Sequence, residues 1–210
     1  MSPDISLICT VYNEEDLIRE LLKSVLEQNR TPEEAVFVDG GSTDNTQNIL
    51  EEYSEEHDLI RFEVEDGANI SEGRNRAIEL AENDHIVGTD GGCILKENWC
   101  GEMEKAFEDG NKALTGLFEP IADNTFETVQ GELRAGHFKP ENVLEGQPPS
   151  ARSIGFKKQV WRDAANFPED LYTGEDAKFC RKVEEAGSDW HVVHGAMVQW
   201  HMRPGSKDCW

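Results

Sequence analysis

Two hydrophobic spacings alternate along the first 118 residues. Short, almost continuous apolar runs are separated by stretches in which apolar residues recur every three or four positions. The runs predict strands buried on both faces, and the stretches predict amphipathic helices. The predicted strands lie at 5–11, 35–38, 59–64, 84–90 and 113–118. The predicted helices lie at 17–26, 49–53, 71–81 and 99–107. This alternation predicts an α/β fold with a mostly parallel sheet and right-handed crossovers.

The second half of the pattern is less regular. It predicts strands at 153–156 and 190–198 and a helix that begins after Gly174 and ends at Gly187. A helix is also expected within 124–138, followed by a proline-containing loop over 139–150. No repeat or linker interrupts the chain, so its 210 residues are expected to form a single domain.

Charge and cysteine content narrow the class of protein. The chain has 20 Lys and Arg against 43 Asp and Glu, a net charge of −23, which disfavours a nucleic-acid partner. The acids are spread over helix faces, so a salt-rich cytoplasm of a halophilic source is one hypothesis and an ordinary acidic protein the other. Five cysteines without a CxxC pair favour a reduced, cytoplasmic protein. No apolar run is long enough for a membrane span, and no signal peptide is visible.

Two strands are each followed by a carboxylate and glycines. Asp39 precedes Gly40 and Gly41, and Asp90 precedes Gly91 and Gly92. Ligands of α/β sheets bind beyond the carboxyl ends of parallel strands, so both acids are candidates for one site. The alternative is that each is a turn aspartate that bonds its own backbone.

The predicted helix at 71–81 carries two arginines in its first turns, Arg74 and Arg76. A helix N-terminus with a glycine-bearing entry and arginines suits phosphate. With the two strand-end acids, these features are those that a nucleotide diphosphate would use. The alternative is that the arginines pair with Glu72 or Glu79 on a solvated face.

Five segments in this order resemble the motifs of family 2 glycosyltransferases with the GT-A fold. They are residues 6–15, 38–44, 73–78, the strand to Asp90, and 174–176. The resemblance runs from about residue 5 to 203. It implies a GT-A domain with helices on both faces of the sheet, a donor half over about 1–118 and an acceptor half over about 119–210. It also implies inverting transfer of a sugar from a nucleotide-diphosphate donor to an acceptor hydroxyl.

The resemblance also implies roles at the donor. Thr10, Tyr12 and Glu14 would border the nucleoside, and Asp39 would contact the base. Arg74 and Asn75 would lie near the diphosphate.

Asp90 matches the first acid of the family's metal-binding Asp-x-Asp motif. It would hold Mg²⁺ or Mn²⁺, hard cations that neutralise a leaving diphosphate. The chain departs from the motif, because Gly92 stands where the second acid is expected. His201 is a candidate additional ligand, and the alternative is that it packs between Trp200 and Met202.

Catalysis is expected at Asp176, which matches the general base, with Glu175 shaping its surroundings. A carboxylate within hydrogen-bond reach of the acceptor hydroxyl can remove its proton. The alternative is that both acids only cap the following helix. Arg152 and Trp161 fall in the half that forms the acceptor side, and we expect them there by placement alone.

Three alternative functions remain open. A retaining transferase or a nucleotidyltransferase would share the fold, although the acidic stretch Tyr12–Glu15 disfavours the latter. A non-catalytic nucleotide-sugar-binding relative is the third, because of Gly92. The implied partners are a UDP- or GDP-type sugar donor and a lipid-linked or saccharide acceptor. Any membrane contact would be peripheral, at the inner face.

Overall fold

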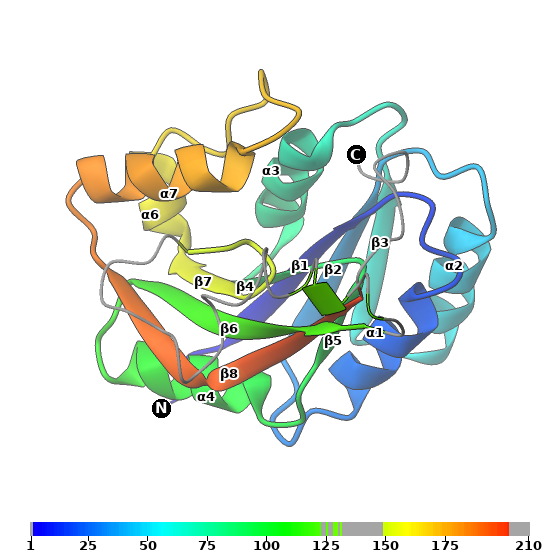
Figure 1. Ribbon diagram of the computed structural model, residues 1–210. Coiled ribbons are helices and arrows are strands. Elements are labelled where there is room, and N and C mark those ends of the chain that lie inside the picture. Colours follow the sequence, from blue (N-terminus) through cyan, green and yellow to red (C-terminus); the bar gives the residue numbers. More distant parts are fainter. Residues whose placement is uncertain (1, 123–124, 126–127, 130, 132–148, 202–210) are drawn as a thin grey trace.

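An eight-stranded sheet runs through the computed structural model, with helices on both faces (Figure 1). The structure describes residues 2–122, 125, 128–129, 131 and 149–201. The strand order is β3-β2-β1-β4-β7-β6-β8-β5. The helix expected within 124–138 and the loop expected over 139–150 lie largely outside the described residues.

The first four strands form a parallel half-sheet. They are β1 (Ile5–Val11), β2 (Glu34–Asp39), β3 (Ile60–Val64) and β4 (His85–Asp90). In the register, Thr10 of β1 lies opposite Asp90 of β4, and Val11 lies opposite Asp39 of β2. The two strand-end acids therefore reach the same edge of the sheet, on either side of β1, as the sequence predicts.

The other half of the sheet is mixed. It contains β5 (Cys93–Leu95), β6 (Ala113–Ile121), β7 (Ile154–Lys157) and β8 (Trp190–His201). Strand β7 lies antiparallel between β4 and β6, β8 runs parallel to β6, and β5 pairs antiparallel with β8. The sequence pattern predicts neither the short β5 nor the full length of β8.

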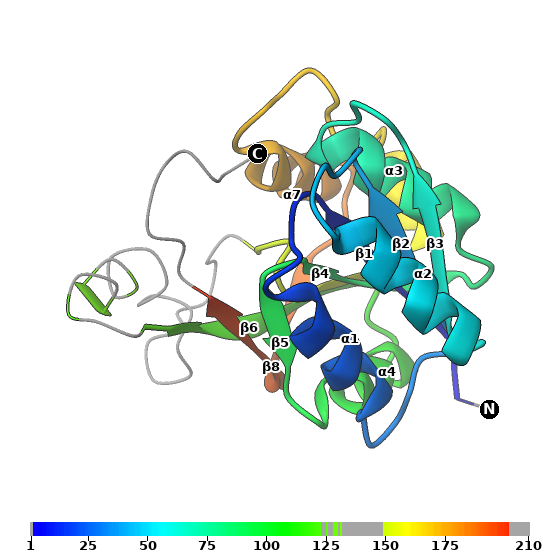
Figure 2. The same ribbon diagram turned by 90° about the vertical axis from the view of Figure 1, so that its right-hand side faces the viewer.

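Two groups of helices cover the two faces (Figures 1 and 2). On one face lie α1 (Ile18–Leu26), α2 (Thr46–Glu56) and α4 (Trp99–Glu108). On the other lie α3 (Ile70–Leu80), α6 (Lys158–Asp163) and α7 (Glu175–Glu185). Alternate residues of β1 divide between the two cores, with Leu7 and Cys9 on one face and Ile8 on the other. This arrangement confirms the predicted α/β architecture with both faces covered.

None of the described helices has the length and apolar character needed to cross a bilayer.

Candidate functional site

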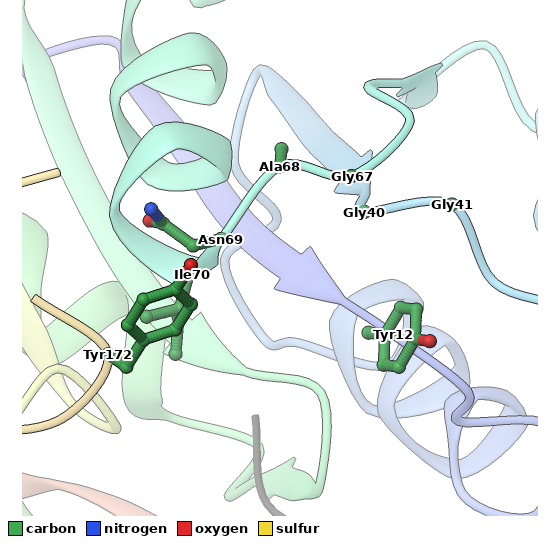
Figure 3. Close-up of a pocket in the computed structure, with 8 residues that line it drawn as sticks. All are labelled: Tyr12, Gly40, Gly41, Gly67, Ala68, Asn69, Ile70 and Tyr172. Atoms are coloured by element: carbon green, nitrogen blue, oxygen red, sulfur yellow. The ribbon is translucent and has the colours of Figure 1, made fainter. Parts of the chain in front are cut away.

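A pocket of about 390 Å³ lies beyond the carboxyl ends of β1 and β2. Its lining residues are Tyr12, Gly40, Gly41, Gly67, Ala68, Asn69, Ile70 and Tyr172. Figure 3 shows the rings of Tyr12 and Tyr172 on opposite sides, with the Gly40–Gly41 and Gly67–Ala68 backbone along one edge. Its size is within the usual range for small-molecule sites. The resemblance suggested Tyr12 here, and the sequence pointed to a ligand at the start of the helix that follows Gly67, but it did not predict Tyr172 in this pocket.

Asp39 fixes one wall of this pocket. The side chain is fully buried, and its Oδ1 accepts hydrogen bonds from the backbone N–H of Gly41 (2.9 Å) and Ser42 (2.7 Å) and from Gln47 Nε2 (2.8 Å). Its Oδ2 accepts one from Ser42 Oγ at 2.5 Å. Gly41 has a φ of +92°, and a Cβ atom there would lie 2.6 Å from Asp66 Oδ1, so the loop requires glycine. Asp39 therefore orders the loop.

Arg74 joins the strand end at β4 to the start of α7. Its Nη2 lies 2.7 Å from Asp90 Oδ1, and its Nη1 lies 2.8 Å from Glu175 Oε1. The Arg74 side chain is 5% exposed, Glu175 10% and Asp90 23%. Burial alone would lower the pKa of Arg74, but the negative charges of Asp90 and Glu175 outweigh burial and raise it. The structure thus brings together three site residues that the sequence predicted from separate motifs.

The guanidinium of Arg74 also lies 5.4 Å from the ring centre of Phe167, which supports a cation–π contact. Its neighbour Arg76 lies on a solvated face, where it pairs with Glu63 (2.7 Å), Glu65 (3.2 Å) and Glu79 (3.6 Å). The surface alternative is therefore correct for Arg76. It is wrong for Arg74, whose partners are Asp90 and Glu175.

Asn75 has a structural place beneath this link. Its Nδ2 donates to the Phe167 carbonyl (3.0 Å) and to Glu169 Oε1 (2.8 Å), and its Oδ1 accepts from Trp161 Nε1 (3.0 Å) and the Phe167 N–H (3.0 Å). These four bonds use all the hydrogen-bonding capacity of the amide. Trp161 is 6% exposed, and its indole N–H, the only polar group of the side chain, donates to Asn75. The two residues hold the Phe167 loop in place, and they offer no free polar group to the donor or acceptor for which the sequence suggested them.

Glu14 and Thr10 lie beside the strand end at Asp90. Both are buried, and neither is among the residues that line the pocket. A Cβ atom at Gly91 would lie 3.0 Å from both Cγ and Oε1 of Glu14, so the glycine lets this carboxylate approach the turn after Asp90. The Thr10 hydroxyl is buried without a hydrogen-bond partner among the described residues. Buried polar groups are normally satisfied, so this hydroxyl is an exception beside the strand end.

The residues around Asp90 suit a hard cation with few protein ligands. Within residues 2–122 and 149–201, no group of three or more His, Cys, Asp or Glu side chains is arranged to hold a metal. The oxygen donors nearest this turn are the carboxylates of Asp90 and Glu14. Such a set fits Mg²⁺ or Mn²⁺ bound through one or two carboxylates together with phosphate oxygens and water.

His201 lies at the end of β8. Its backbone N–H donates to the Gly92 carbonyl (3.0 Å), which brings the chain close to Asp90. Its ring, however, is engaged elsewhere, with Nε2 3.2 Å from Glu20 Oε2 of α1. The structure gives the ring a carboxylate partner that the sequence did not predict, and Met202 of the alternative reading is outside the described residues.

Asp176 occupies the first turn of α7. The helix follows Gly174, whose φ of +75° only glycine adopts readily. Asp176 is partly buried, and its Oδ1 accepts a hydrogen bond from the N–H of Ala177 at 2.8 Å. The helix N-terminus favours the negative charge of Asp176 and Glu175. Because Glu175 is tied to Arg74, the start of α7 is held against the strand end at Asp90.

Arg152 lies on the mixed side of the sheet, immediately before β7. Its guanidinium carbon is 4.0 Å from the ring centre of Trp200 and 5.2 Å from that of Phe118.

Comparisons with known proteins agree with this architecture. The family model "Glycosyl transferase family 2" matches residues 6–165. Glycosyltransferase AglE of Haloferax volcanii is 24% identical over an aligned length of 214, and the match covers 96% of this chain and 68% of AglE. Among solved structures, S. aureus TarS 1-349 in complex with UDP-GlcNAc has a TM-score of 0.73 at 20% identity. The mannosyltransferase PcManGT from Pyrobaculum calidifontis, in complex with GDP-Man and Mn²⁺, has a TM-score of 0.73 at 18% identity.

The two structural matches cover 99% and 98% of this chain, and they confirm the GT-A fold. This chain spans only 61% and 59% of those two chains. The likeness therefore covers the fold of nearly the whole chain and part of each larger relative.

Proposed function

The chain belongs to glycosyl transferase family 2, and from this membership we propose that it moves a sugar from a nucleotide-diphosphate donor to an acceptor hydroxyl with inversion at the anomeric carbon. The observation that carries the proposal is the link through Arg74. It ties Asp90, at the strand end, to Glu175, the neighbour of Asp176. Arg74 thus joins the proposed cation-binding acid to the neighbour of the candidate base.

The pocket beyond β1 and β2 is the proposed nucleoside site. Tyr12 offers an aromatic face, and the loop ordered by Asp39 offers backbone groups to a base. The Thr10 hydroxyl, buried and unpartnered among the described residues, is a further contact near the strand end. A UDP- or GDP-type donor is supported by the ligands of the two structural relatives, UDP-GlcNAc and GDP-Man.

Asp90 is the proposed protein ligand of a divalent cation, with the Glu14 carboxylate close to the same turn. When bound, Mg²⁺ or Mn²⁺ would supply positive charge to the diphosphate as it leaves. The His201 ring can act as a further cation ligand only if its contact with Glu20 breaks.

Asp176 is the proposed general base. As the acceptor oxygen attacks the anomeric carbon, the bond from that carbon to the phosphate oxygen breaks, and the hydroxyl proton passes to the Asp176 carboxylate. Glu175 has a positioning role, because its carboxylate is bound to Arg74. A saccharide or lipid-linked acceptor fits this chemistry, the latter with peripheral contact at a membrane.

Titration calorimetry tests the donor site. UDP-, GDP- and dTDP-sugars are titrated with and without Mn²⁺, in high KCl, into the wild type and the variant Asp90→Ala. Metal-dependent binding of one donor, lost in the variant, supports the site. Metal-dependent binding that persists in Asp90→Ala would contradict the role of Asp90.

Turnover then tests the base. Asp176→Asn should bind the donor as the wild type does and lose about 10²–10⁴-fold in turnover, the usual contribution of a general base. The matched control is Asp170→Asn, which removes a largely exposed carboxylate near the same helix. Wild-type turnover by Asp176→Asn would refute the assignment, and a product that keeps the donor's anomeric configuration would refute inversion.

A second candidate is a non-catalytic nucleotide-sugar-binding protein. Gly92 favours it, since the chain lacks the second acid of the metal-binding motif. Donor binding without hydrolysis or transfer in the presence of Mn²⁺ would support this function over the first.

A further inference from the structure

Arg152 is held by aromatic rings instead of carboxylates. Its guanidinium carbon lies 4.0 Å from the Trp200 ring centre and 5.2 Å from that of Phe118. Nη1 donates to Ser150 Oγ at 3.1 Å, and Nε is buried without a hydrogen-bond partner among the described residues. No carboxylate of residues 2–122 or 149–201 forms an ion pair with it, whereas Arg74 pairs with two.

This environment leaves an incompletely satisfied cation. A buried N–H without an acceptor costs free energy, and contacts with ring faces do not supply one. Aromatic stacking holds the guanidinium plane by its faces and leaves its edge for a planar, two-point contact with phosphate or carboxylate. In a chain of net charge −23, carboxylates are abundant, yet this arginine, with a buried Nε, pairs with none of the described ones.

Arg152 lies close to the strand end that carries Asp90. Its carbonyl accepts a hydrogen bond from Thr89 Oγ1 at 2.9 Å, and Thr89 immediately precedes Asp90. Trp200, on which the guanidinium rests, is paired with Cys93 in the β5–β8 register.

The thiol of Cys93 reports the same proximity. Burial, followed by the charge of Asp90, raises its pKa to about 12, and the charge of Arg152 opposes this rise. Both charges therefore act on one thiol, three residues beyond Asp90.

We propose that Arg152 binds a phosphate group at the Asp90 end of the site. This inference rests on the proposed transferase function. Arg74 already pairs with a carboxylate at each of its terminal nitrogens, whereas Arg152 pairs with none of the described carboxylates. The phosphate belongs either to the donor diphosphate or to a phosphorylated acceptor, and the same guanidinium edge suits both.

The test separates these two sources. Binding of UDP and GDP, and of uridine and guanosine, is measured by calorimetry in the wild type, Arg152→Gln and Arg152→Lys. Arg162→Gln is the matched control, since Arg162 is exposed on α6 and forms no ion pair with the described residues. Thermal unfolding verifies that each variant folds, and if Arg152→Gln does not, the charge-retaining Arg152→Lys carries the comparison.

If the donor diphosphate is the ligand, Arg152→Gln weakens diphosphate binding by about tenfold or more, as for a lost charged hydrogen bond, and leaves nucleoside binding unchanged. The diphosphate affinity of Arg152→Lys lies between those of the wild type and Arg152→Gln, because lysine keeps the charge and loses the planar edge.

If the acceptor phosphate is the ligand, UDP binding is unchanged. The KM for a short-chain polyprenyl phosphate then rises about tenfold or more, while that for an unphosphorylated saccharide does not. The inference is overturned if the wild type binds nucleotide diphosphates and Arg152→Gln matches it in every series. If the wild type itself binds no nucleotide, the proposed function falls together with the inference.

Discussion

Removal of the Arg74 guanidinium is expected to be among the most costly single changes at the site. The variant Arg74→Met keeps an unbranched apolar stem and deletes the charge. It leaves Glu175, 10% exposed, and Asp90, 23% exposed, without the cation that each now contacts at 2.7–2.8 Å. Removing one partner of a buried ion pair costs about 3–5 kcal/mol, and the cation–π contact with Phe167 adds about 0.5–2 kcal/mol. We expect a loss near 4 kcal/mol, because Asp90 is partly solvated.

Urea unfolding measures this loss as a shift in midpoint at constant slope. Arg76→Met is the matched control on the same helix, since its ion pairs are solvent-exposed and their loss should shift the midpoint far less. The double variant Arg74→Met/Glu175→Gln should recover part of the loss, because it removes one of the stranded charges. A loss below about 1 kcal/mol in Arg74→Met, or no recovery in the double variant, would refute the account of a buried, mutually dependent pair.

Four further predictions concern packing, protonation, thiols and salt. Gly73→Ala would place Cβ 2.8 Å from Thr10 Cγ2 and should lower the free energy of unfolding by about 1–3 kcal/mol, measured in urea. Adding Thr10→Ser removes that methyl group and should restore part of the lost stability. No restoration would contradict the clash as the cause. Burial, followed by the charge of Lys157, lowers the pKa of His85, so the stability it contributes is present above its ordinary pKa of about 6.5 and is lost as the pH falls through the lower folded pKa. His85→Phe should therefore reduce the fall in Tm between pH 7 and pH 5, and an equal fall would contradict this. Burial raises the pKa of the four described cysteine thiols, and the variant Cys209→Ser keeps only these four. This variant should react slowly with a thiol reagent when native, and at all four positions in urea. A fast reaction phase of the native variant would contradict this prediction. The net charge of −23 predicts an unfolding midpoint that rises with KCl, and equal or greater stability in dilute buffer would refute self-repulsion.

The periodicity of the sequence was sufficient to predict those helices and strands that are long and have a regular local pattern. β1 to β4 and the helices between them follow from runs and 3.6-residue repeats, and right-handed crossovers then bring Asp39 and Asp90 to one edge. Strand β5 has three residues, too few for a pattern, and its pairing with β8 depends on residues about 100 positions away. The antiparallel insertion of β7 between β4 and β6 is likewise a long-range choice that spacing does not encode.

The site was predictable as a set of residues but not as a set of contacts. Motif spacing identified Asp90, Arg74 and Glu175, yet the bond between Arg74 and Glu175 joins positions 101 residues apart. The resemblance suggested Asn75 as a donor contact, and position in the acceptor half suggested Trp161. Only the fold shows that Trp161 donates its indole N–H to Asn75 and that the other bonds of Asn75 go to Phe167 and Glu169. The glycine-bearing entry of α3 pointed to a ligand at this helix start, but only the fold brings Gly67 and Tyr172 to the same pocket.

The pairing of β5 with β8 has a consequence for the order in which the chain matures during translation. Among the described strands, β5 hydrogen-bonds to β8 alone, so residues 93–95 have no sheet partner until residues 198–200 have left the ribosome. At roughly 5–20 residues per second, that interval is about 5–20 s. The parallel strands β1 to β4 precede it and pair with one another, and so acquire their hydrogen bonds first. In the nascent protein, the strands on the nucleoside side are therefore already paired while residues 93–95, next to Asp90, still lack their sheet partner.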